Sequence, residues 1–351
     1  MIPLFSSLYL RRIWRNPPVN FRVMVLLIAI LLYGTTGFLY FELPGNPDLS
    51  WSDGLWYSLV TMTTIGYGDF FPKTSGGRYL IGVPLMFFGI GLLGYLLSMI
   101  AAALVAAKTR EIQGMSSFQF EDHLIIFNYP GLSKVERVLD ELFSDSAFDR
   151  GTQLILIDAD LPELPPELTS RGVHFVRGNP TRDETLARAN IDKASHAIVL
   201  SKKSGDPDSD NLNVSITLAI EARSKRINSV VECVDASSEE LLRKAGCDSI
   251  VCTSRFDAHF VSQELLNPGM QEVIDELTSS LDGQQIYFTS VAVAGTARFA
   301  DLAASCRELG HLAIGIRRGS QTMLNADAQL ALADGDKLIS IGLSRIKAIA
   351  L

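Results

Sequence analysis

Hydrophobic and polar positions divide the chain into an apolar first third and a remainder in which short apolar runs alternate with amphipathic ones. Two long apolar runs, 21–41 and 79–107, are almost free of charge. A helix needs about 20 apolar residues to cross a bilayer, so both runs are long enough. We predict two membrane helices over these runs, the second long enough to tilt or to project from the bilayer.

A shorter apolar segment lies between the two runs. It follows Ser50, Trp51, Ser52 and Asp53, a helix-start signal in which a Ser or Asp side chain accepts hydrogen bonds from free N–H groups. We predict a helix over 52–63, which is too short to span a bilayer. Such a re-entrant segment is tolerated at membrane depth only where protein buries it or where it lines a watery cavity.

The residues after this short helix, 64–68, read Thr-Ile-Gly-Tyr-Gly. A pore that strips water from K⁺ must offer rings of backbone carbonyl oxygens. Successive carbonyls point to one axis only if right- and left-handed conformations alternate, and Gly66 and Gly68 permit the left-handed ones. We therefore predict a selectivity filter over 64–68. Its K⁺ ligands would be the carbonyls of Thr64, Ile65, Gly66 and Tyr67, with Tyr67 packed against the short helix.

The basic residues flank the two apolar runs on one side. They are Arg11, Arg12, Arg15 and Arg22 before the first run, and Lys108 and Arg110 after the second. Basic flanks favour the cytoplasm, so we expect a multi-pass protein of the cell membrane with both termini cytoplasmic. The first 110 residues carry +4, which leaves −12 for the rest of a chain whose total is −8. That acidic remainder argues against a nucleic-acid partner.

The segment Thr63–Asp69, TTIGYGD, resembles the potassium-channel signature, with Ile65 in place of the commoner Val. The resemblance implies that Trp56 and Asp69 form hydrogen bonds behind the filter. Val60 stands where some family members place a glutamate, which leaves the tryptophan alone to brace the filter. One filter loop supplies one quarter of a ring, so a homotetramer is expected.

The second apolar run contains Pro84, Gly89 and Gly91. Proline removes a helical hydrogen bond, and glycine makes bending easier. One interpretation is a gate hinge at these residues. The other is close helix packing through small side chains, which is common in membranes. The sequence leaves both open.

From residue 123 onward, short apolar strands alternate with amphipathic helices. The predicted strands are 123–127, 153–157, 173–176, 197–200, 229–234 and 249–252. This alternation predicts a doubly wound parallel sheet. We expect a pore domain over 1–114, a Rossmann-like α/β domain over 115–266, and a helical connection with a small α+β lobe over 267–351. The fold class is an all-α membrane pore joined to a cytoplasmic α/β domain.

Gly178–Arg182 (GNPTR) followed by 186–191 (LARANI) resembles the potassium-conductance regulator domain, also called RCK or TrkA-N. Gly335 and Asp336 resemble part of that domain's C-terminal lobe. The filter and this domain on one chain are similar to the two-span, ligand-gated potassium channels of prokaryotes. The resemblance implies passive K⁺ conduction without catalysis, and a ring of eight regulatory domains that acts on the inner helices.

The gating ligand is less clearly marked. A dinucleotide fingerprint needs several glycines at the first strand–helix turn, and the chain has one, Gly131. The candidate nucleotide-binding residues are Asn128, Tyr129, Gly131, Asp158 and Asn179, for NAD, ADP or ATP. The other interpretation is a filled, structural switch point, and both stay open.

Calcium is a weaker candidate ligand. The calcium-gated relatives place three acids where this chain has Ser201, Glu232 and Val234, so only Glu232 could hold a divalent cation there. The acidic loop 206–210 is a second candidate site, although a solvated acidic loop fits it better. A zinc site at Cys247 and Cys252 is a further alternative to plain buried thiols.

Met115 lies between the second membrane run and the first strand. Translation starting there would produce a soluble regulatory subunit, which would supply extra domains to the ring. An ordinary linker methionine is the alternative. Two other function classes are alternatives. A membrane-tethered Rossmann enzyme would need a catalytic constellation, which the sequence does not show, and a Trk- or Ktr-like transport subunit would need four filter repeats where the sequence has one.

Overall fold

The computed structural model describes residues 19–146, 148–281, 283–293 and 297–350, with two compact units divided after Lys108. This division lies six residues before the predicted boundary at Gly114, because the end of the second membrane helix packs with the second unit. Arg11, Arg12 and Arg15, which contributed to the predicted orientation, lie outside the described residues.

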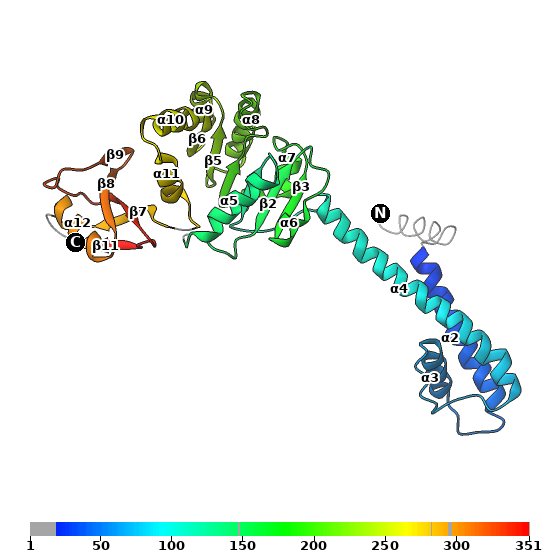
Figure 1. The fold of residues 1–351 in the computed structure, drawn as a ribbon. Helices are drawn as coiled ribbons and strands as arrows, with labels where there is room; N and C mark the ends of the chain where they lie inside the picture. The colour runs from blue at the N-terminus through cyan, green and yellow to red at the C-terminus, as the bar shows by residue number, and fades with distance from the viewer. Residues whose placement is uncertain (1–18, 147, 282, 294–296, 351) are drawn as a thin grey trace, which may run out of the picture. The chain divides into compact units, whose positions relative to one another are not determined.

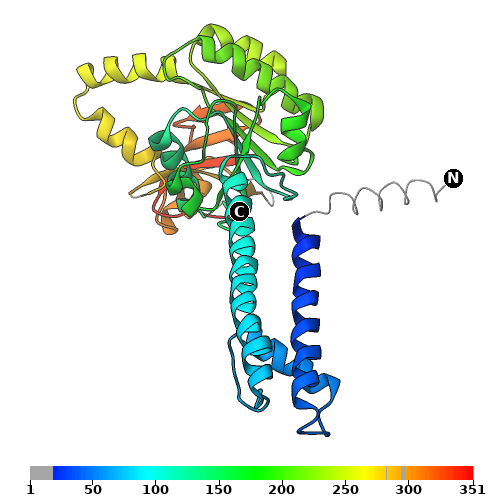
Figure 2. The same cartoon turned by 90° about the vertical axis from the view of Figure 1, so that its right-hand side faces the viewer.

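The first unit is built from helices. They are α2 (Val19–Glu42), α3 (Trp51–Met62), the π-helical turn η1 (Gly77–Gly82) and α4 (Val83–Ile112). Figure 2 shows α2, in dark blue, alongside the cyan α4. A small apolar cluster joins the three α-helices, and its buried members are Ile30, Phe38, Tyr57, Met62, Leu85 and Leu92.

Local chemistry explains where these helices begin. Ser50 caps α3, and it exchanges hydrogen bonds with Asp53 in a capping box, so the helix starts at Trp51, one residue before the predicted start. The π-helical turn precedes Pro84, whose missing N–H takes one donor away from the helical ladder. The α-helical pattern then continues without interruption to Ile112, beyond the predicted end at 107.

The second unit begins with a six-stranded parallel sheet in the order β3-β2-β1-β4-β5-β6. The strands are β1 (Leu124–Phe127), β2 (Leu154–Asp158), β3 (Val173–Arg177), β4 (His196–Val199), β5 (Asn228–Cys233) and β6 (Ser249–Cys252). Each differs from its predicted bounds by at most one residue at either end. The chain turns back across β1 to reach β4, so the switch point lies between these two strands. Figure 1 shows β2 and β3 in one half of this sheet and β5 and β6 in the other.

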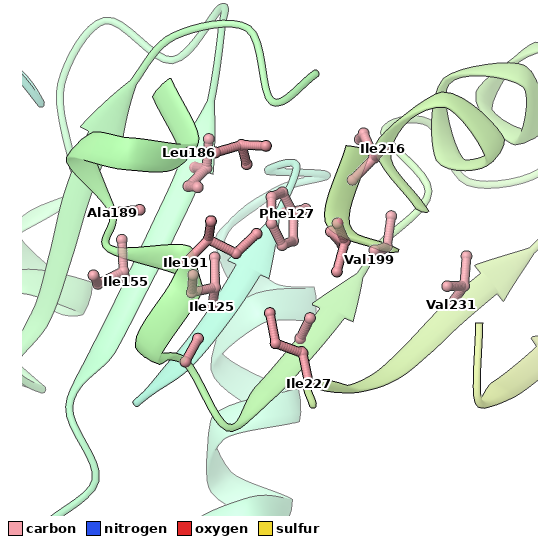
Figure 3. Packing of buried hydrophobic residues seen from close by; sticks show 14 of the residues in the cluster. Ile125, Phe127, Ile155, Leu186, Ala189, Ile191, Val199, Ile216, Ile227 and Val231 are labelled. Atoms are coloured by element: carbon pink, nitrogen blue, oxygen red, sulfur yellow. The ribbon is translucent and has the colours of Figure 1, made fainter. Parts of the chain in front are cut away.

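Helices cover both faces of this sheet. They are α5 (Leu132–Ser144), α6 (Pro166–Ser170), α7 (Asp183–Arg188), the 3₁₀ turns η2 (Ile191–Lys193) and η3 (Ala236–Ser238), α8 (Asp208–Arg223) and α9 (Glu239–Ala245). The helix α10 (Thr253–Leu266) follows β6 and buries none of its side chains. Alternate residues of β1 serve opposite cores: Ile125 and Phe127 pack toward α7 and α8, while Leu124 and Ile126 pack toward α5 and α6. Figure 3 shows the first of these cores.

A helical connection leads to a smaller α+β lobe. It comprises α11 (Met270–Thr278), β7 (Gln285–Ala292), α12 (Phe299–Glu308), β8 (Leu312–Arg318), β9 (Gln321–Leu324), β10 (Lys337–Gly342) and β11 (Ala348–Ala350). Its mixed sheet has the order β11-β7-β10-β8-β9, and α12 buries Leu302 and Cys306 against one face. The predicted fold class is therefore confirmed: an α-helical first unit, a parallel α/β domain and a small mixed lobe.

Candidate functional site

The segment after α3 has an alternating backbone. Thr64, Gly66 and Gly68 have φ values of 60°, 60° and 77°, and the intervening residues are not in this left-handed region. Alternation of this kind turns successive carbonyls toward the same side of the chain. The N–H groups of Ile65 and Gly66 donate to the carbonyl of Val60, at 3.0 and 3.3 Å, so the end of α3 holds the start of the segment.

Side chains behind this segment fix its other side. The indole Nε1 of Trp56 donates to Asp69 Oδ2 at 2.7 Å, which joins α3 to the residue just after Gly68, the last residue of the predicted filter. The ring of Tyr67 stacks on Trp56, with centroids 6.0 Å apart and planes 3° apart. Val60 is buried on the same helix and contributes no carboxylate. The predicted supporting residues are thus in mutual contact.

Glu42 is a supporting residue that the sequence analysis counted only as a charge. Its carboxylate, at the end of α2, accepts hydrogen bonds from the N–H groups of Lys73 and Thr74, both at 3.0 Å, and from the Thr74 hydroxyl at 2.6 Å. It therefore holds the loop that connects residues 64–68 to η1 and α4. A lone acid at the polar end of an apolar run was the available signal.

The glycines of α4 have different surroundings. A Cβ on Gly89 would lie 2.8 Å from the Cα of Met62, so this glycine allows close approach of α4 to the end of α3. Gly91 has no comparable neighbour within the described chain. The contact at Gly89 favours the packing interpretation for that residue, and a hinge at Gly91 stays a prediction.

The polar residues at the switch point already have partners within the chain. The Asn128 amide donates to the carbonyl of Leu200 at 2.8 Å and to the side-chain oxygen of Asn213 at 3.2 Å. Asp158, which is 1% exposed, accepts hydrogen bonds from the N–H groups of Tyr129, Asp160 and Leu161. A carboxylate offers about four acceptor positions, so little capacity is left for a ribose.

Of the remaining candidate residues, Asn179 is also bonded within the chain, whereas Gly131 borders open space. The Asn179 side chain accepts from the N–H and hydroxyl groups of Thr181, which closes a local turn. Gly131 precedes the N-terminus of α5, and open space lies where its Cβ would be. A phosphate fits beside such an N-terminus, whereas the carboxylate of Asp158, the candidate that could bind a ribose hydroxyl, already accepts three hydrogen bonds from the chain. The five candidate residues therefore suit a phosphate better than a whole dinucleotide.

A cavity of about 1180 Å³ lies at the carboxyl ends of β1 and β5, beside the N-terminus of α5. Its walls are the first turns of α5, the loop 204–207, the end of β5 and the start of α10. Lys134 and Arg137 face it from α5, and Glu232, Asp235 and Asp257 contribute carboxylates. The cavity is large enough for a nucleotide-sized ligand and carries both signs of charge.

Glu232 does not offer a free carboxylate to a divalent cation. The Lys134 ammonium lies 2.5 and 2.7 Å from its two oxygens, and the N–H of Ser201 donates to Oε2 at 2.8 Å. Ser201 and Val234, at the other two positions, are buried. The chain's own lysine therefore neutralises the one anion of this site. The sequence analysis missed Lys134 because its partner lies 98 residues away.

The other predicted metal sites have structural roles. Asp210 is buried, and it accepts hydrogen bonds from the N–H groups of Val234 and Asp235 at 2.8 and 2.9 Å. Burial raises the pKa of the Cys247 thiol, which disfavours the thiolate that zinc requires. Within the described ranges, no group of three His, Cys, Asp or Glu side chains is arranged to hold a metal ion.

Comparison with known proteins agrees with this two-part organisation. Residues 25–106 match the ion channel family, and residues 136–253 match the TrkA-N domain family. Probable potassium channel protein 2 of Methanocaldococcus jannaschii is 26% identical over 339 residues, which cover 91% of this chain and 92% of the relative. The calcium-gated potassium channel TvoK of Thermoplasma volcanium is 22% identical over 276 residues, 76% and 75% of the two chains.

A third relative, potassium channel protein 1 of Methanocaldococcus jannaschii, is 26% identical over 235 residues, covering 65% of this chain and 66% of the relative. The segment that matches the ion channel family contains α3 and residues 64–68, and the segment that matches the TrkA-N family contains most of the parallel sheet. The two matches lie one after the other on one polypeptide.

Proposed function

We propose that this protein is a ligand-gated, potassium-selective channel subunit that conducts K⁺ passively across the cell membrane. The observation that carries the proposal is the alternation of left-handed residues at Thr64, Gly66 and Gly68. The hydrogen bond between Trp56 and Asp69 holds this backbone from behind. The names of two relatives, probable potassium channel protein 2 and the calcium-gated potassium channel TvoK, support the same function.

Two helices of the chain are long and apolar enough to cross a bilayer, Phe21–Glu42 and Gly77–Ile112. Many of their apolar side chains are exposed within the single chain, which suits contact with lipid or with further copies. One filter segment supplies one quarter of a K⁺-coordinating ring, so we propose a tetramer in which the carbonyls of residues 64–67 face a common axis. Because the basic residues Arg22, Lys108 and Arg110 flank the two apolar runs on one side, we propose that both termini are cytoplasmic.

The regulatory part is proposed to respond to a ligand in the cavity beside α5. Gly131 and the N-terminus of α5 favour an anionic group such as a phosphate. The pairing of Glu232 with Lys134 disfavours calcium at the neighbouring position. A nucleotide is the ligand class that suits a phosphate site inside a cavity of about 1180 Å³.

Reconstituted vesicles test this function directly. Vesicles loaded with K⁺ and containing the purified channel should accumulate tracer Rb⁺ from a K⁺-free medium, because Rb⁺ fits the same carbonyl rings. Tracer Na⁺ should not accumulate above the level of protein-free vesicles. Equal uptake of the two tracers would argue for an unselective pore.

A ring of eight regulatory domains would need more copies than a tetramer supplies. The connecting helices α10 and α11 expose apolar side chains that a second domain could bury: Phe256, Val261, Leu265, Leu266 and Val273. We therefore expect purified channel to contain, besides the full chain, a fragment that begins at Met115. Met115→Ile should remove the smaller band. A single band in the wild type, with eight domains still in the ring, would assign the extra domains to another source.

A further inference from the structure

The segment between the end of α4 and β1 is docked on the second unit along its whole length. We name residues 114–122 the strap. Over residues 114–120 the even-numbered members Gly114, Ser116, Phe118 and Phe120 are buried or half-buried and the odd-numbered members are exposed, as are Glu121 and Asp122 at its end. This period of two is typical of an extended chain with one face against protein. The strap therefore behaves as part of the α/β domain and not as a free linker.

The last turn of α4 ends in a tight motif. The N–H of Met115 donates to the carbonyl of Arg110 at 2.9 Å, and the N–H of Gly114 donates to that of Glu111 at 3.0 Å. These two bonds, with Gly114 at a φ of 68°, define a Schellman C-cap. A Cβ on Gly114 would lie 2.4 Å from the backbone nitrogen of Arg177, so the cap fits directly against β3.

Hydrogen bonds fix each even-numbered residue of the strap. Arg188 Nη2 donates to the carbonyls of Gly114 and Ser116, the latter at 3.0 Å. The N–H of Phe118 donates to the carbonyl of Arg188 at 2.8 Å, and the Asn190 amide donates to that of Phe120 at 2.8 Å. Beyond them, the N–H of Asp122 donates to the carbonyl of Lys193 at 2.9 Å.

Aromatic packing strengthens the attachment. The rings of Phe118 and Phe120 lie 5.5 Å apart, and the His174 ring lies 4.8 and 4.9 Å from them. Both phenylalanines pack against the buried core that contains Ile125 and Phe127. The contacts on the strap thus come from side chains and backbone of the same domain.

We infer that Arg188 is the positioning residue that fastens the end of α4, the predicted inner helix, to the regulatory domain. A displacement of that domain is then transmitted directly to α4. Its guanidinium contacts three carbonyls, those of Gly114, Ser116 and Arg177. A planar fork with several donors suits this task better than an ammonium. The inference rests on the proposed channel function. It assigns the mechanical coupling between the regulatory domain and α4 to the contacts of Arg188 with the carbonyls of Gly114 and Ser116.

The test compares intact channels carrying Arg188→Ala, Arg188→Lys and a control, Arg182→Ala. Arg182 is an exposed arginine at the N-cap of α7, the helix that ends at Arg188. Hydrogen exchange of peptides covering 114–122 should be at least about tenfold faster in Arg188→Ala, since a charged donor to several carbonyls is lost. Arg188→Lys should show an intermediate rate, and the control should match the wild type. Unchanged exchange at β1 would show that the domain is folded.

Single-channel recordings of the same proteins supply a reading that a purely structural role would not change. The ratio of open to closed time in Arg188→Ala should differ from wild type by at least about fivefold, with the K⁺ over Na⁺ permeability ratio unchanged. Unchanged exchange of the strap, or an unchanged open-to-closed ratio, would overturn the inference. If the wild-type protein does not conduct K⁺, the proposed function fails. The exchange rates alone then decide whether Arg188 fastens the strap.

Discussion

Gly66→Ala should abolish K⁺ conduction. Gly66 has a φ of 60°, and a Cβ in the left-handed region costs about 1–2 kcal/mol per residue. A tetramer would carry this strain four times, about 4–8 kcal/mol in one ring. The backbone would relax by rotating carbonyls away from the axis, so K⁺ would lose ligands that replace its water. Single-channel recording should find no K⁺ current above background.

The matched control is Gly45→Ala, in the turn after α2. There a Cβ would lie 3.7 Å from the nearest backbone oxygen, an ordinary contact, and the residue is not left-handed. This variant should conduct as the wild type does. Wild-type current in Gly66→Ala, with the protein assembled normally, would mean that residues 64–68 do not line the conduction path.

Lys134→Met should destabilise the regulatory domain, and the loss of stability should be the same with and without Ca²⁺. Glu232 is buried, and its carboxylate relies on Lys134 and on the N–H of Ser201. Loss of a charged hydrogen-bond partner costs about 2 kcal/mol. For a domain of this size the midpoint of thermal unfolding should fall by about 4–8 °C, as followed by circular dichroism of the intact channel.

Lys244→Met is the control for this variant. Lys244 also pairs with a glutamate, Glu240, at 2.7 Å, but both side chains are about 70% exposed. Exposed pairs of this kind contribute at most about 0.5 kcal/mol, so its unfolding midpoint should barely change. Added Ca²⁺ should leave the wild-type midpoint and open probability unchanged. Activation by Ca²⁺ that disappears in Glu232→Ala would contradict the account.

Local patterns were enough to predict the two long apolar helices, the alternating backbone at residues 64–68 and the parallel sheet. Gly66 and Gly68 indicate left-handed backbone conformations directly, because glycine adopts them without steric cost. A continuous apolar run such as 154–157 indicates a strand that is buried on both faces of the sheet. The cap at Ser50 is equally local, since its partner Asp53 is three residues away. These features depend on neighbours in sequence.

The functional contacts that the sequence analysis missed join distant segments. Lys134 meets Glu232 only because β1 and β5 lie in the same sheet with α5 on its face. Asp158 looked free to bind ribose, yet the turns after β1 and β2 bring three N–H groups to it. The strap had a local signal, the spacing of Phe118 and Phe120, but Arg188 is 72 residues away in sequence from Ser116, to whose carbonyl it donates.

The central claim is potassium selectivity, and a bi-ionic reversal potential tests it most directly. Purified full-length channel would be placed in a planar bilayer with equal concentrations of K⁺ on one side and Na⁺ on the other. The account predicts a reversal potential displaced toward the K⁺ equilibrium potential by more than about 59 mV, the shift for a tenfold preference for a monovalent ion. A channel whose current reverses near zero would contradict it.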